Sequence, residues 1–270
     1  MRACWFLFAH TMRRIRTLLA ASGVVLSVFQ IFLIVVARSI HTSRAFDQIN
    51  ALIPPFIRAL AGPSLLAFMS FGGIVSLGYF HVSVMSALIA FSISLGTTHS
   101  SEVEIGFIDL ILSRPMARHW VITRTIAIVI FCTALLLGMM MAGTWIGLKT
   151  LAPEGAEWPS VRLVSSLAAN LGLLMLCWGG VAVAIGSLSR RRGAAGAVTG
   201  LIAFATFLLD YVARAWEPAQ SVGWVSPFRY YNPLDLVSGK AIPIKNVLVL
   251  TGIAVAGSIF GYIAFSRKDT

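Results

Sequence analysis

Six long and almost uncharged apolar runs constrain the fold of this 270-residue sequence more than any other feature. A helix needs roughly 20 apolar residues, at about 1.5 Å of rise per residue, to cross the hydrocarbon core of a bilayer. Six segments meet this length: residues 17–37, 78–98, 121–146, 163–186, 194–212 and 246–265. The pattern predicts an all-α, polytopic membrane protein with six transmembrane helices, forming one domain over residues 1–270.

Composition and charge agree with a membrane protein and argue against a soluble one. The sequence is 58% hydrophobic and only 11% charged, whereas soluble domains carry about 25% charged residues. So few charges cannot cover a surface in water, and the remaining surface must face lipid. The net charge of +11 is scattered among short segments and forms no basic patch with interleaved aromatic residues. We therefore expect membrane lipid, and no nucleic acid, as a partner.

Lys and Arg positions favour an orientation with both termini in the cytoplasm. Twelve basic residues then lie on the inner side and nine on the outer side. The inner residues also form tighter clusters next to the spans, where the positive-inside rule has force. The inner set is Arg2, Arg13, Arg14, Arg16, Arg114, Arg118, Arg124, Arg190, Arg191, Arg192, Arg267 and Lys268.

Three segments outside the spans are predicted to lie at the membrane interface. Residues 1–16 alternate apolar and basic positions at helical spacing, which predicts an N-terminal interfacial helix along the inner leaflet. Such a helix could be a simple anchor or an elbow that also contacts a cytoplasmic partner. Segments 38–77 and 214–243 are too apolar for solvated loops and contain Pro and Gly breakers, so we expect short helices there.

The most informative stretch joins the second and third spans on the cytoplasmic side. It reads Glu102-Val-Glu-Ile-Gly-Phe-Ile-Asp-Leu-Ile-Leu-Ser-Arg-Pro-Met-Ala-Arg118. A helix over residues 102–113 would place Glu102, Gly106 and Asp109 on one stripe, where water is available to the charges. On these residues alone two interpretations stay open. The carboxylates could pair with neighbouring arginines, or the stripe could bind a cytoplasmic partner.

This stretch resembles the signature of ABC-2-type transporter permeases. Weaker similarities to the same family lie in Gly78-Tyr-Phe-His-Val82, Ser226-Pro-Phe-Arg-Tyr-Tyr-Asn-Pro233 and Phe265-Ser-Arg-Lys-Asp269. With the six-span layout, the resemblance covers nearly the whole chain. It implies a multi-pass permease subunit of an ABC transporter in the bacterial cytoplasmic membrane, acting as an exporter.

The resemblance also implies partners and site residues. Residues 102–113 would be a coupling helix that sits in a cleft of an ABC-type ATPase, present in two copies. A second permease copy or a related permease would complete the assembly. The ATPase-coupling residues would be Glu102, Glu104, Gly106, Asp109, Pro115 and Arg118. Gly106 would allow close backbone approach, and Pro115 would set the angle into the third span.

No nucleotide or metal site is expected in the chain itself. The sequence has no Gly-x-x-x-x-Gly-Lys-[Ser/Thr] loop, so ATP and magnesium are expected on the partner ATPase. None of the five histidines lies four residues from another histidine, and no Cys-x-x-Cys pair occurs. Catalytic and metal-ligating residues are therefore predicted to be absent, and the chain is expected to be a transport subunit, not an enzyme.

Polar residues within the spans are the remaining candidates for function. Gln30, His81, Asn170 and Asp210 could line a translocation path, or they could form hydrogen bonds between helices. Asp210 lies four residues before Arg214, at the spacing of a helical ion pair. The pairs Gly143/Gly147, Gly196/Gly200 and Gly257/Gly261 allow close helix packing, either within the chain or between two copies.

Two other functional classes stay open at this point. A non-transporting anchor or sensor subunit would recruit a cytoplasmic partner through the same 102–118 stretch. An intramembrane enzyme would need several catalytic side chains at one membrane depth, and acidic residues within the spans are almost absent.

Overall fold

A computed structural model describes residues 2–43, 70–105 and 119–267, and every described element is helical. Six helical stretches are long and apolar enough to cross a membrane, as the sequence predicts. They are α1 (Arg2–Thr42), α4 (Phe71–Leu77) with α5 (Val82–Gly96), α8 (His119–Leu151), α9 (Val161–Leu188), α10 (Arg192–Ala215) and α13 (Ile244–Ser266). The other elements of the described residues are short helices: α6 (Thr98–Glu104), α11 (Glu217–Gln220), η1 (Gly223–Val225), η2 (Pro227–Tyr230) and α12 (Pro233–Val237).

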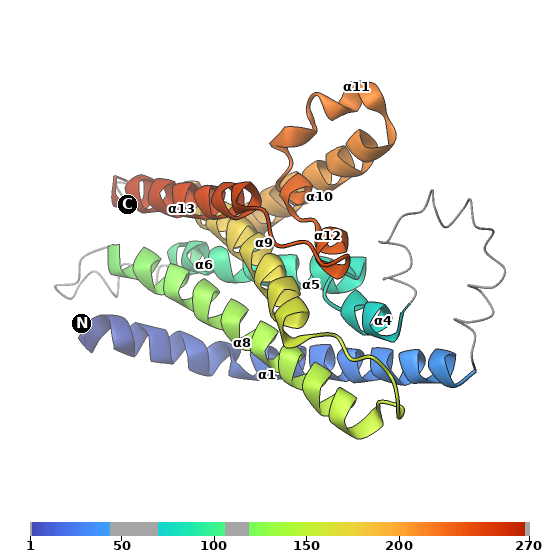
Figure 1. Cartoon of the computed structure of the whole chain (residues 1–270). Helices are drawn as coiled ribbons and strands as arrows, with labels where there is room; N and C mark the ends of the chain where they lie inside the picture. The colour runs from blue at the N-terminus through green and yellow to red at the C-terminus, as the bar shows by residue number, and fades with distance from the viewer. Residues whose placement is uncertain (1, 44–69, 106–118, 268–270) are drawn as a thin grey trace.

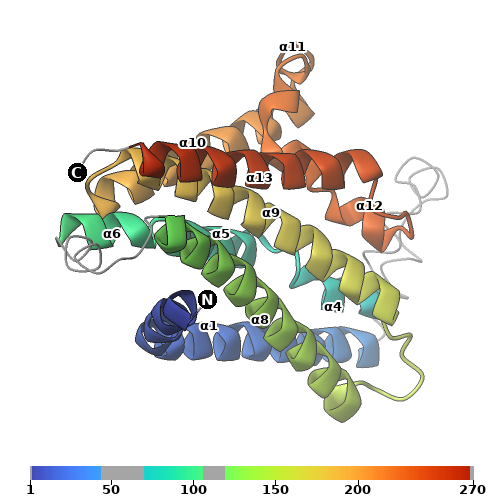
Figure 2. The same cartoon turned by 90° about the vertical axis from the view of Figure 1, so that its left-hand side faces the viewer.

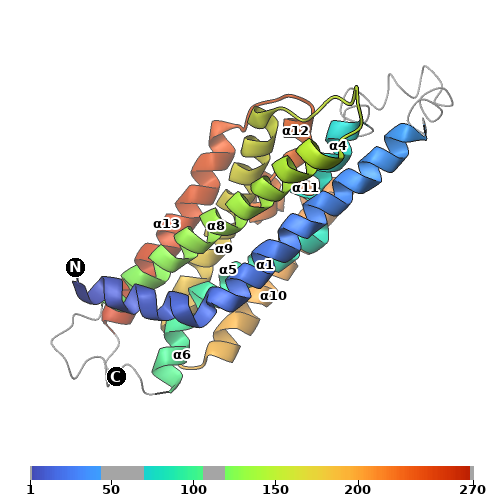
Figure 3. The ribbon, with the colours of Figure 1, turned by 90° about the horizontal axis from the view of Figure 1, so that it is seen from below.

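The six long stretches form one elongated bundle in which α9 is central (Figures 1 and 2). α9 contacts α5, α8, α10 and α13, whereas α1 packs chiefly along α8 (Figure 3). The main core lies between these helices and includes Trp178, Leu171, Leu136 and Ile128. Both chain ends and α6 lie at one end of the bundle, and α11 lies at the other (Figure 1). This arrangement agrees with an even number of membrane crossings.

The predicted interfacial segment and the first span form a single helix, α1, which bends in its N-terminal part (Figure 3). The apolar stripe of this part faces the bundle. Phe8, Met12 and Ile15 pack against the main core, and the Phe8 and Phe131 rings meet edge to face at 5.7 Å. The N-terminal segment therefore contacts the other helices directly, in addition to any contact with lipid.

The second span begins earlier than predicted and is broken. The sequence places its start at residue 78, but α4 already begins at Phe71, and the break between α4 and α5 covers residues 78–81. Gly72 and Gly73, which we expected to act as breakers, lie inside α4. Ser70 caps this helix by accepting a hydrogen bond from the Gly73 N–H at 3.0 Å. Glycine is tolerated in transmembrane helices, so these residues do not end the span.

Polar contacts satisfy the backbone at this break. Tyr231 directly follows η2, and its hydroxyl donates a hydrogen bond to the Tyr79 carbonyl oxygen at 2.9 Å. The Tyr79 and Thr144 hydroxyls are hydrogen-bonded at 2.9 Å. His81 caps α5, since its Nδ1 accepts from the Ser83 N–H at 3.3 Å. Such partners are needed because an unsatisfied backbone group within a membrane costs several kcal/mol.

Of the three predicted glycine pairs, two pack helices within the chain. A Cβ at Gly257 would lie 2.6 Å from the carbonyl carbon of Gly180, and one at Gly143 would lie 2.7 Å from the Cα of Ser27. These glycines allow α13 to approach α9 and α8 to approach α1. By contrast, nothing in the described part of the chain lies within 4 Å of a Cβ at Gly196 or Gly200. The glycine pair on α10 therefore packs against no other helix of the described chain.

The segment 214–243 forms short helices, as predicted. α11, η1, η2 and α12 follow one another between α10 and α13. Trp216 and Trp224 are exposed, which suits the headgroup level. Tyr231 is buried instead, and this burial raises the pKa of its hydroxyl, which donates a hydrogen bond to the Tyr79 carbonyl oxygen.

Candidate functional site

The candidate site is α6 together with the helices that hold it. α6 follows α5 almost without interruption, since only Thr97 separates Gly96 from Thr98. The Ser100 hydroxyl donates to the Gly186 carbonyl oxygen at 2.8 Å, near the end of α9. The buried His99 ring lies 3.2 Å, Nε2 to Oγ, from the Ser187 hydroxyl. Two successive residues of α6 are thus tied to the last turn of α9.

A buried ion pair joins α6 to the third span. The Arg124 Nη2 donates to the Glu102 Oε2 at 2.6 Å, and the two residues are only 1% and 7% exposed. Arg124 lies in the second turn of α8. Two charges buried this deeply must stay paired, because removing either partner would leave an uncompensated charge out of water. Glu102 therefore points into the bundle instead of lying on the water-accessible stripe that we expected.

The second carboxylate of the predicted stripe connects α6 to α10. The Glu104 Oε2 accepts a hydrogen bond from the Arg192 backbone N–H at 3.0 Å, at the first turn of α10. A carboxylate at this position also interacts favourably with the positive end of the helix dipole. The Arg192 guanidinium donates to the Ser94 carbonyl oxygen at 3.2 Å and hydroxyl oxygen at 3.0 Å. α5, α6 and α10 meet at this arginine.

The other predicted coupling residues are Gly106, Asp109, Pro115 and Arg118, and all four lie outside the described residues. The described helix begins at Thr98 and ends at Glu104. The predicted coupling stretch therefore starts directly from a helix that is attached to α8, α9 and α10.

The structure describes all four candidate polar residues of the spans, and it brings Gln30 and His81 to the same break in the second span. Gln30 is fully buried on α1, and neither its Nε2 nor its Oε1 has a hydrogen-bond partner among the described residues. A Cβ at Gly78 would lie 2.5 Å from the Gln30 Oε1, so Gln30 abuts the break in the second span. His81 lies at the same break, with its ring 5.6 Å from that of Phe29.

Asn170 and Asp210 lie on α9 and α10. Asn170 is 2% exposed. Asp210 accepts a hydrogen bond through Oδ2 from the Arg214 Nε at 2.8 Å, which confirms the predicted helical ion pair. Arg214 also reaches the Asn232 side-chain oxygen at 3.3 Å. Asp210 thus has a structural partner for Oδ2, whereas its Oδ1 and both polar atoms of the Gln30 amide are buried without a hydrogen-bond partner among the described residues.

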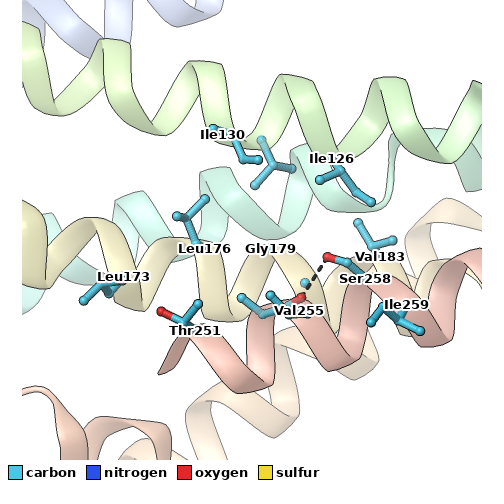
Figure 4. A pocket seen from close by; sticks show the side chains of 13 residues that line it. Ile126, Ile130, Leu173, Leu176, Gly179, Val183, Thr251, Val255, Ser258 and Ile259 are labelled. Atoms are coloured by element: carbon cyan, nitrogen blue, oxygen red, sulfur yellow. Dashed lines mark hydrogen bonds between the residues drawn. The ribbon is translucent and has the colours of Figure 1, made fainter. Parts of the chain in front are cut away.

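Two apolar crevices open on the bundle. The first, of about 330 Å³, lies between α8, α9 and α13 (Figure 4). Ile126, Ile130, Leu176, Val255 and Ile259 line it, and the Ser258 hydroxyl is turned to its own helix, donating to the Ala254 carbonyl oxygen at 2.8 Å. No charged side chain of the described residues lines it, so it suits neutral apolar molecules.

The second crevice, of about 270 Å³, lies between α5 and α10. Met85 and Ile89 line one wall, Phe204 and Phe207 line the other, and Phe228 of η2 contributes as well. Val82, next to His81, also lines it. This crevice therefore begins next to the break in the second span.

Arg124 and Arg192 were not among the predicted site residues, although both hold α6 in place. A signal for Arg124 was present, because it falls within a predicted span. A charge at such a position is expensive unless it is paired, and the nearest upstream carboxylates are Asp109, Glu104 and Glu102. No comparable signal identifies Arg192. It is the last of three consecutive arginines, and nothing in the sequence distinguishes it from Arg190 and Arg191.

One family comparison decides the class of the protein. Residues 7–266 match the family described as the multidrug efflux system permease Rv1217c, C-terminal domain. This match covers nearly all of the chain, including every membrane-spanning stretch. The chain belongs to this permease family. Membership is consistent with the resemblance to ABC-2-type permeases and makes the chain a multi-pass membrane protein and a transport subunit. A search of curated proteins found no match.

Among the residues that the structure describes, no three His, Cys, Asp or Glu side chains form a group that could hold a metal ion. The polar chemistry is concentrated in the attachments of α6 and at the break in the second span.

Proposed function

We propose that this chain is the membrane-spanning subunit of an ATP-binding-cassette exporter. A separate ATPase subunit binds ATP and magnesium, docks on the cytoplasmic stretch after α6, and drives substrate across the membrane. The observation that carries this proposal is the attachment of α6 to three spans. Glu102 binds Arg124 of α8, Ser100 binds α9, and Glu104 binds the first turn of α10.

These attachments give a physical route from partner to membrane. A short helix held by hydrogen bonds alone would yield when pushed, but a buried ion pair resists separation of its two charges. A rigid movement of residues 106–118 would then displace α6, α8 and α10 together. In this account Glu102 and Glu104 transmit movement, whereas Asp109, Pro115 and Arg118 contact the ATPase and Gly106 allows its close approach.

The substrate class that fits is hydrophobic. Both crevices are lined almost wholly by apolar side chains, and the matching family is described by a multidrug efflux permease. We place the path at the crevice between α5 and α10. A second permease copy would enclose it, since Leu201, Phe204 and Leu208 leave an apolar face of α10 exposed and the Gly196/Gly200 pair is open.

The docking role is tested by reversing charges outside the buried pair. Asp109→Lys combined with Arg118→Glu should reduce co-purification of the ATPase about tenfold or more, because reversed charges at an interface cost several kcal/mol. The ATPase to use is one encoded next to this permease. Membrane insertion should be unchanged, since both positions lie outside the predicted spans.

Glu154→Lys combined with Arg162→Glu is the matched control. It makes the same charge changes at the other end of the bundle, where Glu154 lies between α8 and α9, Arg162 lies in the first turn of α9, and both residues are exposed. Co-purification should stay at the wild-type level. Normal association of the Asp109/Arg118 variant would remove the docking proposal.

A second experiment separates a permease from an anchor or sensor subunit. In liposomes that contain the permease and the ATPase, a transported substrate should stimulate ATP hydrolysis, whereas an anchor or sensor subunit would show no such stimulation.

A further inference from the structure

A third cavity, beside α6, differs from the two apolar crevices in having one polar and one apolar side. It measures about 170 Å³ and lies between the N-terminal part of α1, the end of α5, α6 and the first residue of α10. His10, Arg14 and Arg192 contribute its basic groups. Ile15, Leu18 and Phe91 contribute apolar surface. Such a lining matches a ligand with an anionic head and an apolar tail.

The charge balance of this cavity is positive. Glu102 also lines it, but its carboxylate is already neutralised by Arg124 at 2.6 Å. Arg14 is exposed and makes no ion pair with any carboxylate that the structure describes. Among the described residues, the Arg192 guanidinium donates to the Ser94 oxygens and to no carboxylate. Two guanidinium groups on different helices therefore line one cavity, and neither forms an ion pair with a carboxylate of the described chain.

The position of the cavity along the bundle fits a lipid headgroup. Arg14 stands just before the first apolar run, Arg192 begins α10, and Ser94 lies near the end of α5. Three membrane spans begin or end around it. Basic pockets between transmembrane helices at the cytoplasmic side bind anionic lipid headgroups. Leu18, which is 55% exposed, would contact the first part of an acyl chain.

We propose that this cavity binds the phosphate headgroup of an anionic phospholipid, held by Arg14 and Arg192, with an acyl chain against Ile15 and Leu18. The site does not depend on the transport proposal. Because Arg192 also contacts Glu104 through its backbone N–H, a bound lipid would stand between α1 and the attachments of α6.

Native mass spectrometry of the purified full-length chain tests this site, using phosphatidylglycerol and phosphatidylcholine with identical acyl chains. The wild type should retain phosphatidylglycerol in preference to phosphatidylcholine. Arg14→Gln combined with Arg192→Gln should weaken phosphatidylglycerol binding about thirtyfold, and Arg14→Gln alone about fivefold, since each basic residue near a lipid surface contributes a similar increment. The single variant is informative even if loss of the Arg192 contacts to Ser94 impairs folding.

The matched control is Arg13→Gln combined with Arg190→Gln. It removes the same charge from α1 and from the segment before α10, at exposed residues that do not line the cavity. The affinity of this control variant for phosphatidylglycerol should stay within about twofold of the wild-type affinity. Three results would overturn the proposal: equal loss in the control, full affinity in Arg14→Gln, or displacement of the lipid by millimolar inorganic phosphate, which would indicate a site for a soluble anion.

Discussion

Replacing Glu102 by alanine should destabilise the folded chain by about 3–5 kcal/mol, because it leaves Arg124 charged and buried without a partner. The double variant Glu102→Leu/Arg124→Met should recover most of this loss. It removes both charges, and apolar residues of similar volume commonly replace a buried ion pair at little cost. Thermal unfolding of the detergent-solubilised protein, followed by tryptophan fluorescence, measures both effects.

The control is an exposed ion pair in the same chain. Asp235 binds Lys240 at 2.8 Å, with side chains that are 41% and 69% exposed. Asp235→Ala should therefore change the free energy of unfolding by less than about 1 kcal/mol. If Glu102→Ala proved as mild as this control, the buried pair would not hold α6 to α8, and the proposed route for movement would be lost.

Gly257→Ala should be the other strongly destabilising change, although it adds a single methyl group. That methyl carbon would lie 2.6 Å from backbone atoms of Gly180, which cannot rotate away as a side chain could. α13 would have to move from α9, its principal packing partner. Overpacking of this kind costs about 1–3 kcal/mol, and a lower unfolding temperature in detergent would reveal it.

Gly252→Ala is the matched control, with the same substitution on the same helix. Apart from the neighbouring residues and backbone of α13 itself, no atom of the described chain lies within 4 Å of the added carbon. Stability should therefore stay the same or rise slightly through helix propensity. Equal unfolding temperatures for the two variants would show that α9 and α13 do not cross as closely as described.

The spans could be predicted because lipid imposes a simple rule on them. A membrane crossing needs a long apolar run. Five of the six predicted runs fall within one helix each, and the run 78–98 overlaps the broken stretch of α4 and α5. The predicted ends of the helices were less accurate. α8 continues to Leu151, five residues beyond the predicted limit at 146, because a helix need not end where its apolar run leaves the hydrocarbon. The ion pair of Asp210 with Arg214 was predictable, since the two residues are four positions apart on one helix and therefore lie on the same side of it.

Features that depend on distant residues could not be predicted. The break at residues 78–81 contains no proline, and its partners Thr144 and Tyr231 lie far along the chain. Glu102 and Arg124 are separated by 22 positions, and periodicity alone left open whether the carboxylate faces water or the bundle. Only the packing of α6 on α8 decides this, because it removes both charged groups from solvent together.

We propose that the ATPase docks at the end of the bundle that holds α6. A photo-reactive amino acid at position 109, in the complex reconstituted into liposomes, tests it most directly. A matched probe replaces Glu217 on α11, at the other end (Figure 1). We predict an adduct between permease and ATPase from position 109 and none from position 217. An adduct from position 217 alone would contradict the account.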